Sequence, residues 1–142
     1  MSDSLLKENV RYYYNENNQN CAETLLLAAN KTYDLGLDES HAILFSGFGG
    51  GLYTGNVCGA LAGSTAALSK LLVKTKAHEC EELPKAQRKL VNNFRSVLGD
   101  TQCGKLKPIH HNETDRCLNT CLLAAEALEK TLADLKEAGI LA

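Results

Sequence analysis

The sequence is poor in proline and has no long run of lysine or arginine. Only 2 of its 142 residues are proline, 44% are hydrophobic and 23% are charged, which excludes collagen-like, mucin-like and linker sequences. The 15 basic and 17 acidic side chains give a net charge of −2, so the chain has no excess of positive charge that would concentrate a polyanion. We therefore expect one folded domain spanning residues 1–142 that does not bind nucleic acid.

The sequence also lacks segments that would direct it to a membrane. Its first residues have no basic stretch followed by an apolar core, as a secretory signal needs, so we expect a cytoplasmic protein. Residues 42–69 are 28 residues without a formal charge, but 7 of the 11 glycines lie among them. Because such a cluster breaks a helix and leaves backbone groups that lipid cannot satisfy, it predicts a glycine-rich turn between two helices and no membrane span.

The apolar residues recur at helical spacing, and no stretch alternates as a half-buried strand does. This pattern predicts an all-α fold, a compact bundle of about five main helices with a glycine-rich turn before the central helix. The main helices are expected at residues 4–14, 19–33, 56–72, 84–98 and 114–137, with a shorter one at residues 39–45. We expect a loop at residues 100–112.

Six cysteines are the candidate functional residues. In a reducing compartment, clustered cysteines indicate metal binding, redox chemistry or core packing. Cys21 and Cys58 fall in the first turns of expected helices, where unpaired N–H groups and the helix dipole stabilise a thiolate. We therefore expect a lowered pKa for Cys58, which also follows the glycine-rich turn. Tight packing of a small apolar residue beside Gly59 explains the same position equally well.

The other four cysteines lie in less distinctive places. Cys103 is in the expected loop, and Cys80 is in a charged segment where we expect it to be exposed. Cys117 and Cys121 are four residues apart, so they share one face of the last helix and could offer two thiolates to one metal. A single pair at this spacing more often packs in a core, and Cys121 lies in a stripe of leucines that favours packing.

Motifs for other chemistries are missing or incomplete. His110 and His111 could complete a metal set with neighbouring cysteines, but adjacent histidines in a polar loop are more often solvated. Residues 47–51 resemble a phosphate-binding turn, yet no strand precedes them and no Lys-Ser/Thr pair follows. The sequence has no CxxC, CxxCH or HExxH motif and no carboxylate pair in an apolar setting, so the cysteines remain the candidate site.

Four segments together resemble a known family. VCGALAG at residues 57–63 is similar to the CGAxxG signature of the C_GCAxxG_C_C family, whose members are about this long and are described as redox-active. Residues 20–22, 47–51 and 94–106 resemble that family's early cysteine, its glycine-rich turn and its third-cysteine segment. The fourth cysteine of the family is matched at residue 117, followed by AAE at residues 124–126. The resemblance assigns the family's cysteine positions to Cys21, Cys58, Cys103 and Cys117, and leaves out Cys80 and Cys121.

The resemblance implies a redox role and leaves the substrate and any cofactor unknown. Our leading interpretation is a thiol redox protein that acts by thiol–disulfide exchange, or by electron transfer through the cluster of four cysteines. In the exchange reaction Cys58 attacks and Cys21, Cys103 or Cys117 resolves the mixed disulfide, and the activity of a thiol–disulfide oxidoreductase is compatible with this interpretation. Its partner would be a redox protein or a small thiol. Alternatively, the same four cysteines hold zinc or an iron–sulfur cluster, or the protein is a structural or interaction protein whose cysteines only pack. A homo-oligomer is compatible with each interpretation, and the first two require the four cysteines to converge on one site.

Overall fold

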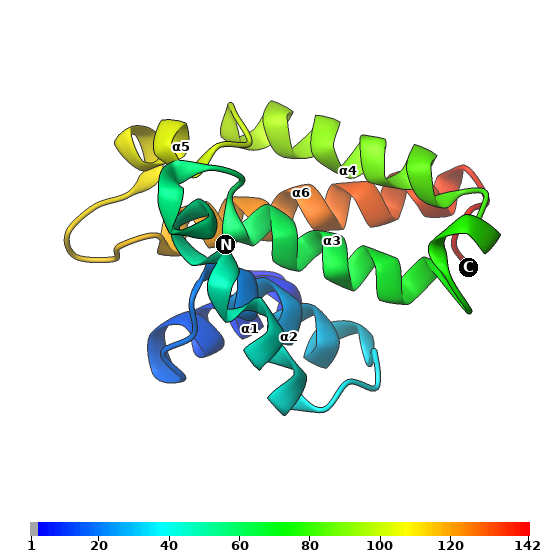
Figure 1. Cartoon of the computed structure of the whole chain (residues 1–142), viewed down its shortest axis with the longest axis horizontal. Helices are drawn as coiled ribbons and strands as arrows, with labels where there is room; N and C mark the ends of the chain where they lie inside the picture. The colour runs from blue at the N-terminus through cyan, green and yellow to red at the C-terminus, as the bar shows by residue number, and fades with distance from the viewer. Residues whose placement is uncertain (1–2) are drawn as a thin grey trace.

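The computed structural model describes residues 3–142, which form an assembly of helices (Figure 1). Its α-helices are α1 (Leu5–Arg11), α2 (Cys21–Tyr33), α3 (Gly59–Leu72), α4 (Leu83–Leu98), α5 (Cys103–His110) and α6 (Leu118–Glu137). Shorter π- or 3₁₀-helical segments cover Tyr12–Glu16, Glu39–Phe48, Gly51–Gly55 and Ala77–Glu79. The expected all-α class is confirmed, because these residues contain no β-strand. None of the helices described is long and apolar enough to cross a bilayer.

The number of helices differs from the expectation, since residues 3–142 form six α-helices where about five were expected. The additional helix is α5, which lies within the expected loop at residues 100–112. Gly104 and Pro108 make this segment a poor helix by composition, but Leu106 and Cys103 are buried against the rest of the protein. Tertiary packing therefore stabilises a helix that local propensity does not indicate.

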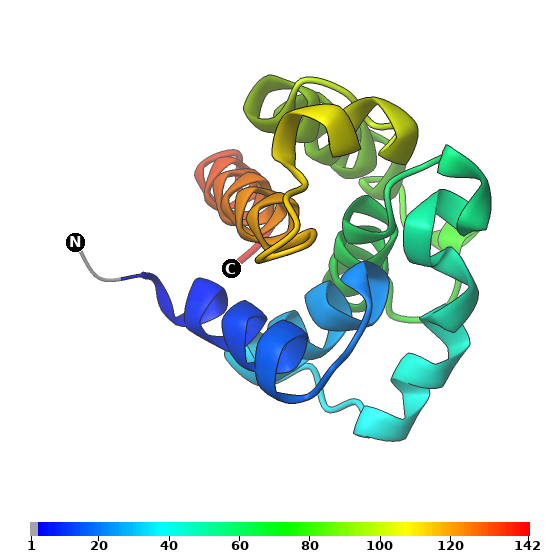
Figure 2. The ribbon, with the colours of Figure 1, turned by 90° about the vertical axis from the view of Figure 1, so that its left-hand side faces the viewer.

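Helices α3, α4 and α6 run side by side along the long axis of the molecule, as Figure 1 shows, while α2 packs on α3 and α6, and α1 packs on α2 and α6. Seen from the end of the molecule in Figure 2, α5 and the glycine-rich segment lie at the same end as the start of α3. Helix α2 packs most extensively on α3, and α4 on α6. One buried hydrophobic cluster draws side chains from all six α-helices.

Helices α2 and α3 approach each other closely because α3 has glycines on the face that meets α2. A Cβ at Gly63 would lie 2.3 Å from the carbonyl oxygen of Ala22, and a Cβ at Gly59 would lie 3.2 Å from the nitrogen of Ala22. Residues four apart share one face of a helix, so both glycines meet the same turn of α2. The CGAxxG motif is therefore a packing motif that sets the start of α3 against the start of α2.

The glycine-rich segment differs from the simple turn that was expected. A 3₁₀ segment, Glu39–Phe48, leads into a left-handed turn in which Gly50, Gly51, Leu52 and Tyr53 have φ of 59°, 64°, 62° and 56°. Leu52 and Tyr53 rarely adopt this backbone conformation, which costs L-residues roughly 1–2 kcal/mol each. The turn delays the start of α3 from the expected residue 56 to Gly59, and this leaves Cys58 as its N-cap.

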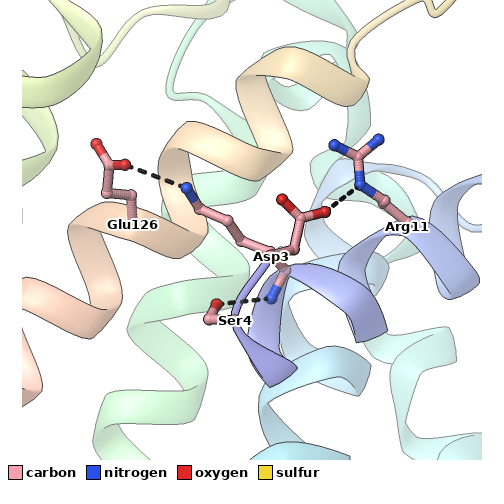
Figure 3. Close-up of polar contacts among 5 residues, drawn as sticks. Asp3, Ser4, Arg11 and Glu126 are labelled. Atoms are coloured by element: carbon pink, nitrogen blue, oxygen red, sulfur yellow. Dashed lines mark hydrogen bonds and ion pairs between the residues drawn. The ribbon is translucent and has the colours of Figure 1, made fainter. Parts of the chain in front are cut away.

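Helix α1 is attached to α6 by both polar and apolar contacts. Ser4 caps α1 by accepting the N–H of Lys7 at 3.2 Å, and the Nζ of Lys7 lies 3.1 Å from Oε1 of Glu126 on α6 (Figure 3). The same figure shows the side chain of Arg11 donating to Asp3. Exposed ion pairs of this kind contribute only about 0–1 kcal/mol. The burial of the apolar side chains of α1 is therefore the larger contribution.

The contact between α2 and α3 predicts that Gly63→Ala destabilises the protein. The added methyl group would overlap a backbone carbonyl that cannot rotate away, and overpacking of this kind costs about 1–3 kcal/mol. Gly47→Ala is the matched control, because a Cβ there would meet nothing within 4 Å. Urea unfolding should show a loss of about 2 kcal/mol for Gly63→Ala and a change within about 0.5 kcal/mol for Gly47→Ala. Equal unfolding midpoints for the two variants would contradict the packing role.

Candidate functional site

The four expected cysteines line one cavity of about 260 Å³. Each comes from the start of a different helix: Cys21 and Cys103 are the first residues of α2 and α5, and Cys58 and Cys117 are the N-caps of α3 and α6. The helix start expected for Cys21 is therefore confirmed. Cys117 was expected inside its helix, but α6 begins one residue later.

The start of α2 is fixed by local hydrogen bonds. The side chain of Asn20 accepts the N–H of Glu23 at 2.9 Å, and the carboxylate of Glu23 accepts the N–H of Asn20 at 2.9 Å. Reciprocal bonds of this kind form a capping box. The Nδ2 of Asn20 also donates to the carbonyl oxygen of Ser46 at 3.0 Å, which ties the helix start to the segment before the left-handed turn. These bonds position Cys21 at the cavity.

Backbone pairing holds Cys58 near Cys103. The N–H of Cys58 donates to the carbonyl oxygen of Thr101 at 2.8 Å, and the N–H of Cys103 donates to the carbonyl oxygen of Asn56 at 2.7 Å. The two bonds form a short antiparallel bridge between segments far apart in the sequence. Gly51 in the left-handed turn packs on this bridge, since a Cβ there would lie 2.7 Å from the Cβ of Cys103. The glycine-rich turn thus packs against the bridge that holds Cys58 near Cys103.

A chain of hydrogen bonds joins three thiols. The bond between Cys117 and Cys21 raises the pKa of Cys117 and lowers that of Cys21, as a bond donated by Cys117 should. A second bond, between Cys21 and Cys121, raises the pKa of Cys21, and with burial it leaves that pKa well above its usual value. Cys121 lies in the core, with none of its surface exposed, as its place among the leucines predicted. Its contact with Cys21 was not expected.

The expectation of a lowered pKa for Cys58 is wrong. Burial raises the pKa of this thiol, while the N–H groups of Ala60 and Leu61 lower it, and the net result is a pKa of about 11. Cys58 is 3% exposed, so its thiolate would lose almost all contact with water. Burial likewise raises the pKa of Cys103, although Lys107 acts in the opposite direction.

Cys117 is the cavity cysteine with the most distinctive surroundings. It is partly exposed, and the Nδ1 of His111 lies 3.2 Å from its sulfur. Its backbone N–H donates to the hydroxyl oxygen of Tyr14 at 2.9 Å, and the guanidinium of Arg116 lies 4.9 Å from the centre of the Tyr14 ring. No pattern in the sequence indicates that Tyr14, 103 residues away in the chain, contacts Cys117. His111 precedes Cys117 by six residues, and this spacing alone does not predict a contact. The two side chains meet because residues 112–116 form a turn between them.

The metal interpretation has no support in this geometry. No group of three or more His, Cys, Asp or Glu side chains in residues 3–142 is placed to hold a metal ion. All six cysteines are free thiols in this structure. The Nε2 of His110 lies 2.8 Å from the carbonyl oxygen of Leu98, so this nitrogen is bonded to the backbone and not to a cysteine sulfur. Cys80 does not line the cavity, and its sulfur lies 3.7 Å from the carbonyl oxygen of Leu72.

The fold and the site define an all-α protein with a cavity of thiols at the starts of four helices. Residues 19–131 match the family model described as "Putative redox-active protein (C_GCAxxG_C_C)", and the chain belongs to this family. It is also similar to an uncharacterized protein of Archaeoglobus fulgidus, to which it is 27% identical over 133 residues, covering 84% of this chain and 86% of that protein. No solved structure matches the chain. The family resemblance drawn from the sequence is thereby confirmed.

The raised pKa of Cys58 predicts slow alkylation at neutral pH. Because iodoacetamide reacts with the thiolate, labelling of Cys58 in the reduced, folded protein should rise about tenfold for each pH unit and reach half its maximum near pH 11. The same cysteine in denaturant should titrate near the ordinary pKa of a thiol, 9.0. Mass spectrometry of the Cys58 peptide gives both curves. A folded-state midpoint at or below the denatured one would contradict the role of burial.

Proposed function

We propose that this protein is a thiol redox protein that exchanges disulfides through the cysteines of its cavity. The observation that carries the proposal is that Cys21, Cys58, Cys103 and Cys117 line one cavity, with a hydrogen bond between Cys117 and Cys21. Thiols close enough to share a proton can form a disulfide after only a small movement. Membership of a family described as redox-active supports the same conclusion.

Cys117, and not Cys58, is the attacking thiol in this proposal. Cys58 is 3% exposed, whereas Cys117 is partly exposed and has an imidazole nitrogen 3.2 Å from its sulfur. The pKa of Cys117 is also raised, by the hydrogen bond with Cys21 and by burial, and His111 acts in the opposite direction. A histidine at this distance can accept the thiol proton, and the resulting ion pair favours the thiolate, which is the nucleophile in disulfide exchange. His111 is exposed, so the imidazolium that forms can be solvated.

The proposed reaction transfers two electrons to the substrate. The Cys117 thiolate attacks one sulfur of a substrate disulfide, and the substrate thiolate that leaves takes the proton from His111. Cys21, hydrogen-bonded to Cys117, then attacks the sulfur of Cys117 and releases the second substrate thiol with its proton. The products are a Cys21–Cys117 disulfide and two substrate thiols. A small thiol or a partner dithiol returns the two electrons by the reverse exchange.

Cys58 and Cys103 are a second dithiol in this proposal. They line the same cavity as the first pair, and the pKa of each is influenced by the sulfur of Cys117. Attack by Cys103 on the sulfur of Cys117 in the oxidised first pair would release Cys21 as a thiol. Attack by Cys58 on the sulfur of Cys103 would then release the Cys117 thiol and leave the disulfide at Cys58–Cys103. In this proposal the buried pair, Cys58 and Cys103, stores two reducing equivalents. The partly exposed pair, Cys21 and Cys117, reacts with the substrate.

The two roles are tested by serine variants and a neutral substrate, hydroxyethyl disulfide. Cys117→Ser should slow the release of mercaptoethanol by about a hundredfold or more, because the nucleophile is lost. Cys21→Ser should accumulate a mixed disulfide on Cys117, seen by mass spectrometry as one added mercaptoethanol group. Cys80→Ser is the control, since Cys80 lies outside the cavity, and it should react at the wild-type rate. Wild-type rates for Cys117→Ser would overturn the assignment of the nucleophile.

A further inference from the structure

We propose that the substrate of the thiol cavity is a small anionic disulfide, whose negative groups bind at Lys107 and Arg116. The inference rests on the proposed function and adds a substrate class to it. Three features of the cavity carry it: the charges of the side chains that line it, the helix ends that point to it, and its size. Each is independent of which cysteine attacks.

The side chains around the cavity include two cations and no carboxylate. The cations are Lys107 on α5 and Arg116 beside Cys117. Neither is paired in any ion pair among residues 3–142. Besides the cysteines, the other polar lining residues are neutral: Tyr14, Asn18, Gln19, Asn20, Tyr53 and Thr120. Because the whole chain has a net charge of −2, this positive lining is a local feature and does not follow from a basic composition.

Four helices begin at the cavity, each with its N-terminus at one of the cysteines. They are α2, α3, α5 and α6, with 13, 14, 8 and 20 residues. A helix N-terminus carries a positive partial charge of roughly half a unit and N–H groups without intrahelical acceptors. Helices α3, α5 and α6 have no side chain capping their first turns. The helix ends and the two cations therefore favour an anion at the same place.

Local structure directs both cations to the cavity. Lys107 lies four residues after Cys103 on α5, so the two side chains share one face of that helix. Arg116 has a left-handed backbone, with φ of 55°, and exchanges two backbone hydrogen bonds with Asn112, at 2.7 and 3.1 Å. Its guanidinium stacks over the ring of Tyr14. The position of Arg116 is thus set by its backbone and by the aromatic ring below it.

The size of the cavity favours a small molecule. Its volume of about 260 Å³ lies just below the range of about 300–1,000 Å³ that is typical of sites for drug-sized ligands. Cys21 and Cys117 are the partly exposed thiols, so a disulfide must reach them through this space. A compact disulfide with carboxylates at its ends places its sulfurs at the thiols and its charges near the cations.

The test compares three disulfides that differ mainly in charge: dithiodipropionate, a dianion; hydroxyethyl disulfide, which is neutral; and cystamine, a dication. Rates of reduction by the reduced protein are divided by the rates with dithiothreitol, which removes differences in intrinsic reactivity. At low ionic strength the dianion should react roughly tenfold faster than the neutral disulfide, and the dication more slowly than both. Added salt should reduce this preference, because the cations lie near solvent.

Variants of the two cations test whether Lys107 and Arg116 cause the preference for the dianion. Lys107→Met and Arg116→Met should each lower the ratio of dianion to neutral rates about threefold. Lys105→Met is the matched control, because Lys105 is also exposed on α5 but does not line the cavity, and it should leave the ratio unchanged. The ratio is the readout because Lys107 also affects the pKa of Cys103, which changes the rates of all substrates together.

The possible results separate this inference from the function on which it rests. Equal rates for the dianion and the neutral disulfide would overturn the anionic substrate and leave the thiol redox function standing. The same holds if Lys105→Met lowers the ratio as much as Lys107→Met does. No reduction of any of the three disulfides would overturn the redox function and the substrate class together.

Discussion

The cavity depends on the close contact between the first turns of α2 and α3. Gly63 sits so near Ala22 that a methyl group there would lie 2.3 Å from its carbonyl oxygen, and Gly59 makes a similar approach one turn earlier. Because Ala22 follows Cys21 and Gly59 follows Cys58, this contact brings the two cysteines to the same cavity. The other two cysteines are then added by hydrogen bonds, Cys103 through the bridge to Asn56 and Cys117 through its N–H to a tyrosine hydroxyl.

Two opposing electrostatic effects meet at these helix starts, and their magnitudes decide the protonation of Cys58. A helix N-terminus stabilises an adjacent charge by about 0.3–1 kcal/mol, and by up to about 2 kcal/mol when partly buried. The pKa of Cys58 rises from 9.0 to about 11, and at about 1.4 kcal/mol per unit this corresponds to roughly 3 kcal/mol against the thiolate. Burial therefore destabilises the Cys58 thiolate by more than the helix N-terminus stabilises it, and the thiol is protonated at neutral pH.

The sequence was sufficient where structure is local and failed where it depends on packing. The helix starting at Cys21 follows from the capping residues Asn20 and Glu23, which lie beside it in the chain. Helix α5 was missed because Gly104 and Pro108 disfavour it locally, and only distant contacts stabilise it. The raised pKa of Cys58 was missed for the same reason, since helix position is visible in a sequence and burial by other segments is not. The convergence of the four cysteines on one cavity also depends on packing, and the sequence predicted it only as a requirement of the redox and metal interpretations.

In the proposed function, the depth at which each thiol lies gives the cysteines different roles. Cys21 and Cys117 are partly exposed, Cys58 and Cys103 are buried at the cavity wall, and Cys121 lies in the core behind Cys21. Access to a disulfide is one of the factors that set the rate of exchange, so in the proposed reaction the outer pair meets the substrate first. Burial also protects the inner thiols, because a protonated thiol with little exposure is a poor target for oxidants. The pKa is raised at all four of these thiols, so exposure and not protonation distinguishes the outer pair from the inner pair, and the proposed exchange assigns the contact with substrate to Cys21 and Cys117 on that ground.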